Sequence, residues 1–393
     1  MRLGDCCKTN LHTYSDKEKW SLIRYLDTGS ITEGRIDEIQ TLYPGVDKIP
    51  SRARRKASVG DILFSTVRPN QKHYGIIEAG TENLLVSTGF TVVTVDTTIA
   101  DPYFIYYYLT QSSVIESLQA IAEQSTSTYP SIKPSDIEDI ELDLPELETQ
   151  KKIGSTLRML DRKIALNEEI NDNLEQQAAA LFESWFVNYD PWDGVQPSEW
   201  ENAPLGSFVE IKRGGSPRPI QDFLSDSGLR WLKISDVTSL SSPFVIEIKE
   251  HIKEEGLRKT VFLHAGELVL SNSATPGIPK ILDVDTCIHD GWLYFPKSEL
   301  SKYYLYLFFK HIRKELVALG NGSVFTNLKT DILKAFPATK ADEATLKEFD
   351  ALVTPLFDAM LNADRENFKL AALRDALLPK LMSSEIDVSE VEL

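Results

Sequence analysis

The fold of this chain is decided by residues 147–186, which read LETQKKIGSTLRMLDRKIALNEEINDNLEQQAAALFESWF. Beyond Gly154, neither glycine nor proline interrupts the stretch, and apolar side chains recur at alternating intervals of four and three residues. This heptad pattern predicts one long central helix over residues 147–187, about 60 Å long at the usual rise per residue. Its predicted seam comprises Ile153, Leu157, Leu160, Ile164, Asn167, Asn171, Leu174, Ala178, Leu181 and Trp185.

A second stretch with the same pattern, residues 342–382, predicts a distal helix. Placing Phe349 on Ile153 also places Asn367 on Asn171, which indicates an internal duplication. The expected seam of the distal helix comprises Phe349, Val353, Leu356, Met360, Ala363, Asn367, Leu370, Leu373 and Leu377. Because amphipathic helices bury their apolar stripes, we expect the two helices to pack against each other. Pro355, absent from the first copy, is expected to kink or restart the distal helix near Thr354.

Asn171 and Asn367 each place an amide in an otherwise apolar seam. A buried amide costs stability unless it is paired, and its best-attested use in a coiled coil is to fix register and partner. The alternative is that each asparagine lies exposed at a helix edge.

The segments beside the helices also repeat. Residues 1–146 predict a mixed α/β domain with strands over residues 61–67, 75–78, 88–95 and 137–144, and a helix that begins at Pro102. Residues 188–341, a linker followed by a second domain, repeat motifs of the first: GDILFS at Gly60 corresponds to GELVLS at Gly266. The aromatic runs 103–108 and 303–309 have helical spacing and are predicted to be core rather than base-stacking surfaces. Residues 383–393 form an acidic tail.

These patterns together predict an α+β fold. Two similar mixed α/β domains are expected to be separated by two long helices, packed as an antiparallel coiled coil with pseudo-two-fold symmetry. Such an arrangement would act as a spacer that holds the two domains a fixed distance apart. A bipartite DNA target is its natural ligand, although a paired peptide or protein ligand would fit the same geometry.

Composition excludes several classes of protein. The hydrophobic fraction of 42% and the charged fraction of 26% are those of an ordinary globular protein, and no apolar run reaches the roughly 18 residues of a membrane span. The start MRLGDCCKTN has no apolar signal region, so a cytoplasmic location is expected. Three cysteines, Cys6, Cys7 and Cys287, indicate reduced thiols rather than a disulfide framework or a zinc site. The net charge of −17 argues against nucleic acid, but basic residues cluster locally.

Two stretches carry a family resemblance. The run LDLPELETQKKIGSTLRMLDRKIALNEEINDNLE, in which Pro-x-x-Glu-x-Gln leads into LDxKIxLN, resembles the central conserved region of type I restriction–modification specificity (S) subunits. The run NFKLAALRDALLPKLMSSEI resembles their distal conserved region. The order of two target-recognition domains and two conserved helices covers nearly the whole chain.

The resemblance implies a non-catalytic subunit that binds a split DNA sequence through its two domains. Its helices would dock two modification subunits, adenine methyltransferases that use S-adenosylmethionine, and through them restriction subunits. The resemblance implies no cofactor and no metal in this chain.

Side chains that donate to phosphates and base edges gather in expected turns and basic clusters of both domains. In the first domain they are Arg52, Arg54, Arg55, Lys56, Ser65, Thr66, Arg68, Asn70, Gln71, Lys72, His73, Thr126, Ser127 and Tyr129. In the second they are Lys212, Arg213, Arg218, Ser271, Asn272, Ser273, Thr275, Lys280, Asn321, Ser323, Thr326 and Asn327. The alternative for each is a solvated surface or a connecting loop.

Two other classes of function stay open at this point. A coiled-coil adaptor without DNA binding would use the same helices. A metal-dependent nuclease could use Glu210-Ile-Lys212 or Glu247-Ile-Lys249 as part of its site, although this tripeptide is common. The sequence contains no Walker loop, HExxH or GxSxG motif.

Overall fold

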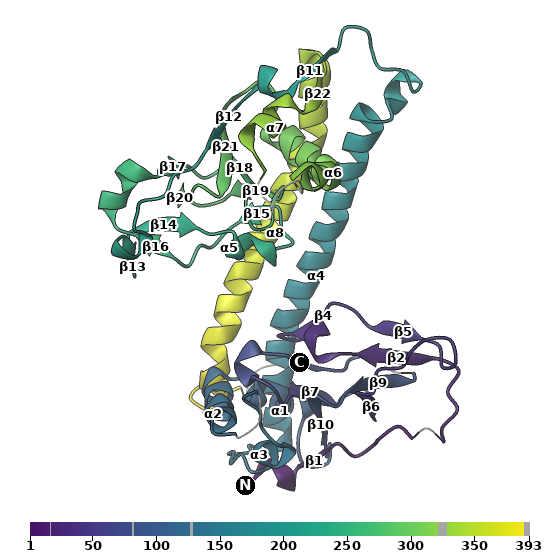
Figure 1. The fold of residues 1–393 in the computed structure, drawn as a ribbon. Coiled ribbons are helices and arrows are strands. Elements are labelled where there is room, and N and C mark those ends of the chain that lie inside the picture. Colours follow the sequence, from purple (N-terminus) through teal and green to yellow (C-terminus); the bar gives the residue numbers. More distant parts are fainter. Residues whose placement is uncertain (16, 81, 126–128, 321–327, 389–393) are drawn as a thin grey trace. The chain divides into compact units, whose positions relative to one another are not determined.

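The computed structural model describes residues 1–393 except 16, 81, 126–128, 321–327 and 389–393. The chain divides into two compact units: unit 1 contains Met1–Arg162 and Leu370–Leu393, and unit 2 contains Lys163–Lys369. The border between them falls inside both long helices, α4 (Leu147–Phe186) and α8 (Glu343–Met382). Each unit is therefore described by itself (Figure 1).

Unit 1 contains two four-stranded sheets. One has the order β1-β10-β7-β8 and is antiparallel; the other has the order β5-β2-β9-β6, with β2 parallel to β9. The strands are β1 (Cys7–Thr9), β2 (Ile23–Leu26), β3 (Ile31–Thr32), β4 (Arg35–Ile36), β5 (Gln40–Leu42), β6 (Ala53–Lys56), β7 (Ile62–Ser65), β8 (Tyr74–Ile76), β9 (Leu84–Ser87) and β10 (Phe90–Val95). All four residues of β7 are buried, which explains its continuous apolar sequence.

Two local predictions for unit 1 are wrong. The helix expected from Pro102 is divided into α1 (Pro102–Leu109) and α2 (Ser112–Glu123), and the hydroxyl of Thr110 donates to the carbonyl of Tyr107 at the break. The strand expected over residues 137–144 does not form: its first two residues belong to the short helix α3 (Pro134–Glu138), and of the rest only Glu141 makes a bridge, with Arg2. Pro134 occupies the first turn of α3, and the carboxylate of Asp136 accepts the amide of Lys133 at 2.7 Å.

Unit 2 repeats the strand order of unit 1. Its antiparallel pairs β12-β21-β18-β19 correspond to β1-β10-β7-β8, and its parallel pair β14-β20 corresponds to β2-β9. The strands are β11 (Glu201–Pro204), β12 (Val209–Arg213), β13 (Leu224–Ser225), β14 (Leu229–Leu232), β15 (Phe244–Val245), β16 (His251–Ile252), β17 (Val261–Leu263), β18 (Leu268–Ser271), β19 (Pro279–Leu282), β20 (Thr286–Ile288), β21 (Trp292–Ser298) and β22 (Pro337–Lys340). The shorter helices are α5 (Ser235–Thr238), α6 (Lys302–Gly320) and α7 (Thr330–Ala335).

The same hydrogen bonds recur at matching positions. The amide of Thr66 donates to the carbonyl of Gly89 at 2.8 Å, and the amide of Asn272 donates to the carbonyl of Gly291 at 2.8 Å. Both bonds join the residue after a buried strand to the turn that precedes the next long strand. The prediction of an α+β fold with two similar mixed domains is therefore confirmed.

A matching pair of glycines shows how closely the repeated elements approach. A Cβ atom on Gly4 would lie 3.2 Å from the Cβ of Glu138, and one on Gly206 would lie 3.1 Å from the Cβ of Lys334. Each glycine thus lets a short helix, α3 or α7, pack against the start of its domain.

In unit 2 the two long helices are antiparallel. The amide of Asn167 donates to the side-chain oxygen of Asn367 at 2.8 Å, and that of Asn171 donates to Asp364 at 2.8 Å. Asn171 is buried and Asn367 is half-buried, so both asparagines lie in the seam with hydrogen-bond partners. In unit 1, Arg374 of α8 pairs with Asp161 of α4 at 2.7 Å.

The seam residues differ in burial along both helices. The buried members are Ile153, Leu157, Asn167, Asn171, Ala178, Phe349, Val353 and Met360. The half-buried members are Leu160, Ile164, Leu174, Leu181, Trp185, Leu356, Ala363, Asn367, Leu370 and Leu377. Leu373 is 48% exposed, and its place in the seam was predicted wrongly. From Leu370 the interval of four residues reaches Arg374 rather than Leu373, so Leu373 lies beside the seam. A straight helix also drifts from a strict seven-residue repeat, which brings Phe182, Phe186 and Phe357 into the core.

Pro355 neither ends nor restarts α8, which is one helix from Glu343 to Met382. The expected restart near Thr354 is therefore wrong. Pro355 and Ala351, whose carbonyl the proline leaves without its helical donor, both lie at exposed positions. Water can satisfy that carbonyl, so the cost of the proline is smaller than in a buried helix.

Candidate nucleic-acid interface

A strained polar turn follows β7 in unit 1. Arg68 and Lys72 both have left-handed backbones, with φ of 48° and 56°, and they flank the short 3-10 turn Pro69–Gln71. A non-glycine residue in this conformation costs roughly 1–3 kcal/mol, and such strain concentrates at functional sites. The strain holds several polar side chains of the turn at the surface.

Arg68, Asn70 and Gln71 line a hollow of about 360 Å³ together with Gln119 and Pro130. The backbone amide of Asn70 donates to the side chain of Gln119 at 3.3 Å, which ties the turn to α2. The guanidinium of Arg68 lies 5.4 Å from the centre of the Tyr129 ring, and Tyr129 is 57% exposed. Amides, a guanidinium and an exposed aromatic ring are groups that bind base edges and stack on bases.

Other predicted residues of unit 1 are used inside the domain. The side chain of Ser65 is buried and donates to the carbonyl of Val67 at 3.0 Å, and the hydroxyl of Thr66 donates to Gly89 at 2.9 Å. A ring nitrogen of His73 lies 2.7 Å from the carbonyl of Ile31. These three side chains stabilise the turn rather than project from it.

The basic residues of β6 also differ from one another. Arg55 donates to Asn10 at 2.5 Å and to the carbonyl of Phe90, and burial lowers its pKa. Lys56 pairs with Glu18 and lies over the ring of Trp20. Arg54 is half-buried and Arg52 is exposed, whereas Lys72, in the turn after β7, pairs with Glu33 at 2.5 Å. Thr126 and Ser127 lie outside the described residues.

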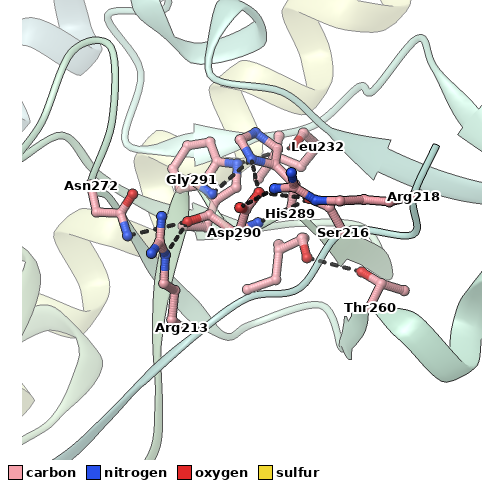
Figure 2. Close-up of polar contacts among 11 residues, drawn as sticks. Arg213, Ser216, Arg218, Leu232, Thr260, Asn272, His289, Asp290 and Gly291 are labelled. Carbon is pink, nitrogen blue, oxygen red and sulfur yellow. Dashed lines mark hydrogen bonds and ion pairs between the residues drawn. The ribbon is translucent and has the colours of Figure 1, made fainter. Parts of the chain in front are cut away.

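In unit 2 a cluster forms around Asp290, in the turn between β20 and β21 (Figure 2). Ser216 donates to one carboxylate oxygen at 2.7 Å, and Arg218 donates to the other at 3.0 Å. Nε of Arg213, the last residue of β12, donates to the main-chain carbonyl of Asp290. Two arginines from one glycine-rich loop are thus attached to a single residue.

The electrostatics keep this cluster in one protonation state at neutral pH. The hydrogen bond from Ser216, followed by the charges of Arg213 and Arg218, lowers the pKa of Asp290 below its usual range. Burial lowers the pKa of His289, whose Nδ1 accepts the amide of Gly291 at 2.8 Å. Asp290 is therefore charged and His289 neutral, with its remaining proton on Nε2.

The strand β18 ends in residues that were predicted to contact DNA but lie inside. Ser271 is fully buried and donates to the carbonyl of Thr275 at 2.6 Å; Asn272 is 2% exposed and donates to the carbonyl of Asp290 at 3.4 Å. Ser273 and Thr275 are half-buried. The exposed Lys212 pairs with Glu210 at 2.9 Å. Asn321, Ser323, Thr326 and Asn327 lie outside the described residues.

Lys280 was predicted to contact DNA, and this is wrong because its side chain is 3% exposed. Its ammonium group donates to the carbonyl of Leu240 at 2.6 Å and to that of Ser242. Burial lowers the pKa of Lys280 to about 8, although Glu175 and Asp364 oppose this shift.

This lysine gives unit 2 a pH dependence that can be measured. Unfolding restores the ordinary pKa of 10.5, so the unfolded chain binds more protons than the folded one between about pH 8 and pH 10.5. Stability is therefore expected to rise with pH across this window, by about 3 kcal/mol in full. Below the window the lysine is protonated in both states and adds no pH dependence. The free energy of unfolding in urea is measured for the wild type and for Lys280→Met near pH 8 and near pH 10. The difference between the two proteins gives the increase in stability that is due to Lys280. Equal slopes for the two proteins would contradict the assignment.

Sequence reasoning did not identify Ser216, Asp290 or Gln119 as parts of these surfaces. Gln119 was expected to lie in the helix that begins at Pro102, and Asp290 belongs to no motif that was predicted to bind DNA. Asp290 lies more than 70 residues from Arg213 and Arg218 in the sequence, so no local pattern indicates this cluster.

Two negative findings concern the residues that the structure describes. Among them, no group of three or more His, Cys, Asp or Glu side chains is placed to hold a metal ion. No helix in the same part of the chain combines the length and apolar character required to cross a membrane.

Glu210 and Lys212, the strand residues of the nuclease alternative, form an ion pair at the surface. Cys6, Cys7 and Cys287 are buried free thiols.

Comparisons with known proteins give one consistent result. The chain is 25% identical, over 457 aligned positions that cover 98% of both chains, to the type I restriction enzyme HindI specificity subunit of Haemophilus influenzae. It is 24% identical to the MjaIX specificity subunit of Methanocaldococcus jannaschii, covering 84% of this chain and 79% of the relative. The solved S subunit of a type I restriction–modification system from M. genitalium has the same fold, with a TM-score of 0.58 at 16% identity over 97% of this chain and 95% of that one.

The family described as type I restriction modification DNA specificity domain matches residues 49–176 and 197–339. Each of the two matches covers most of one repeat, and together they span more than half of the chain. Neither the adaptor nor the nuclease alternative is favoured by these matches. The chain therefore belongs to the type I restriction–modification DNA specificity family, and it is an S subunit.

Proposed function

We propose that this S subunit recognises a bipartite DNA target, with one half-site read by each unit. The observation that supports the proposal is the strand order that both units share. In both units, exposed polar groups follow a strand of the corresponding antiparallel sheet, although not the equivalent strand. Arg68, Asn70 and Gln71 follow β7 in unit 1, whereas Arg213 and Arg218 lie at and after the end of β12, the counterpart of β1, in unit 2. Two domains with the same strand order but different surface side chains suit a protein that recognises two different DNA sequences.

The proposed surfaces are basic although the chain has a net charge of −17. Acidic residues collect elsewhere, in residues 136–148 and in residues 385–393. A local excess of arginine is enough to bind a phosphate backbone, because interactions with distant surface charges are screened over about 8–10 Å. The acidic surface is then left for protein partners.

The proposed partners are two modification subunits, adenine methyltransferases that carry S-adenosylmethionine, and restriction subunits recruited through them. The S subunit itself would catalyse nothing and bind no cofactor. In this proposal α4 and α8 supply the docking surface and set the gap between the half-sites.

The test is a map of adenine methylation in host DNA, made with and without this chain in cells that supply the modification subunits. We expect one split sequence to be methylated only when the chain is present. Arg68→Ala combined with Gln71→Ala should relax one half of that sequence, whereas Lys297→Ala, an exposed control on β21, should change nothing. Methylation that is identical with and without the chain would refute the proposal.

A further inference from the structure

Asp290 joins two arginines that approach it from the same loop. Its carboxylate accepts a hydrogen bond from Ser216 at 2.7 Å and one from Arg218 at 3.0 Å. Its main-chain carbonyl accepts hydrogen bonds from Nε of Arg213 and from the side-chain amide of Asn272. Figure 2 shows Arg213 and Arg218 reaching Asp290 from different sides. All three oxygen atoms of Asp290 thus accept hydrogen bonds, and two of these bonds come from the arginine side chains.

We propose that Asp290 is a positioning residue that presents Arg213 and Arg218 to a guanine in the half-site read by unit 2. This inference rests on the proposed function. A guanidinium has five N–H donors, and each arginine uses only one of its nitrogens on Asp290. The donors that remain form the fork that matches O6 and N7 of guanine in the major groove.

The anchoring makes this contact stronger and more specific. A free arginine side chain loses rotamer entropy when a ligand immobilises it. Arg218 is 77% exposed, yet its ion pair with Asp290 already restricts it before DNA arrives. A donor that is fixed in advance discriminates by geometry, because it cannot turn to satisfy a wrongly placed acceptor.

The charge of Asp290 favours a base over a phosphate. Its side chain is 38% exposed and ionised, and it lies 3.0 Å from the guanidinium of Arg218. A phosphate bound to that arginine would be repelled by the carboxylate, whereas the neutral edge of a base would not. The contact is therefore expected to contribute sequence preference with little dependence on salt.

The surrounding backbone holds the loop that carries both arginines. The amide of Gly214 donates to the carbonyl of Trp292 at 2.9 Å, and that of Gly215 donates to Ile288 at 3.3 Å. A Cβ atom on Gly215 would lie 2.9 Å from the carbonyl of Lys259, so only glycine fits this approach without a shift. The arginine positions are thus set by main-chain contacts as well as by Asp290.

Among the described residues of unit 1, the position that corresponds to Asp290 holds a different side chain. Matching Gly291 to Gly89 places Thr88 at the position of Asp290, and the amide of Thr88 donates to the carbonyl of Arg52 at 2.9 Å. Threonine cannot hold two cations. The preference for guanine should accordingly affect only one half of the target.

The experiment uses the S subunit assembled with its modification subunits and DNA in which both half-sites are randomised. The wild-type complex should select a G·C pair at one position or more of one half-site. Arg218→Ala and Arg213→Ala should each relax a G·C position of that half-site by about ten- to a hundredfold and leave the other half unchanged. Asp290→Asn removes the charge but keeps the size, and should relax the same positions without lowering total DNA binding. Arg218→Lys keeps the charge without the fork, and should behave as Arg218→Ala does.

Three results would overturn the inference. One is a wild-type half-site without any G·C pair; another is an Asp290→Asn complex with unchanged sequence preference. The third is a uniform loss of binding to all sequences by Arg218→Ala, restored by Arg218→Lys and accompanied by a weaker salt dependence, because that pattern identifies a phosphate contact. A wild-type complex that shows no sequence selection at all would instead refute the proposed function. Lys297→Ala serves as the matched control.

Discussion

Phe349→Ala is expected to lower the free energy of unfolding of unit 2 by about 3–5 kcal/mol. Phe349 is fully buried where α4, α6 and α8 of this unit meet. Its ring centre lies 4.8 Å from that of Phe186, 5.8 Å from that of Trp185 and 6.4 Å from that of Tyr304. Alanine would remove the apolar area and leave a cavity that rigid aromatic neighbours cannot fill.

The matched control lies on the same helix and in the same unit. Phe368 is 47% exposed, so Phe368→Ala removes the same atoms mostly from solvent and is expected to cost less than about 1 kcal/mol. Urea unfolding followed by tryptophan fluorescence measures both variants. Similar losses for the two would mean that the aromatic cluster does not stabilise unit 2 as its burial implies.

The helices and the repeat could be predicted because each depends on patterns within the sequence. The spacing of Ile153, Leu157 and Asn167 predicts one long helix, and α4 spans Leu147–Phe186. The matching of Gly60 with Gly266 extends to their backbones, which have φ of 90° and 92°. Periodicity predicts an element well when burial on one face is what sustains it.

The direction of side chains within the turns could not be predicted. Asn272 and Lys280 are polar residues beside an expected turn, and both face inward, where main-chain carbonyls accept their amide and ammonium groups. Ala274, between them, has a left-handed backbone with φ of 57°, which redirects the chain after β18. No local pattern encodes such a reversal, since it depends on contacts with residues far away in the sequence.

The same argument explains why the cluster at Asp290 was missed. Arg213 and Arg218 are separated from Asp290 by more than 70 residues, and only the pairing of β12 with β21 brings them together. Sequence alone identified the two donors but not the acceptor that orients them. The repeated fold is thus predictable from repetition in the sequence, whereas the proposed DNA-contacting surface depends on side chains that differ between the two units.

Replacing residues 1–146 with the equivalent domain of another S subunit is expected to change one half-site completely and to leave the other intact. Unit 1 has its own core, but that core includes Ile153 and Leu157 of α4 and Leu381 and Met382 of α8. A graft therefore folds well only if its inner surface fits these four side chains. Where it does, the new half-site should be preferred over the old one by a factor of about a thousand or more, since specific and non-specific binding differ by at least that much.

The measurement is the methylation map of cells that carry the chimaera together with the modification subunits. The reciprocal exchange of residues 201–341 is the control, and it should change the opposite half-site. A chimaera that methylates nothing can be tested by replacing Ile153 and Leu157 with the residues of the donor subunit, which should restore methylation. If both half-sites changed in either chimaera, recognition would be shared between the units, and the assignment of one half-site to each would fail.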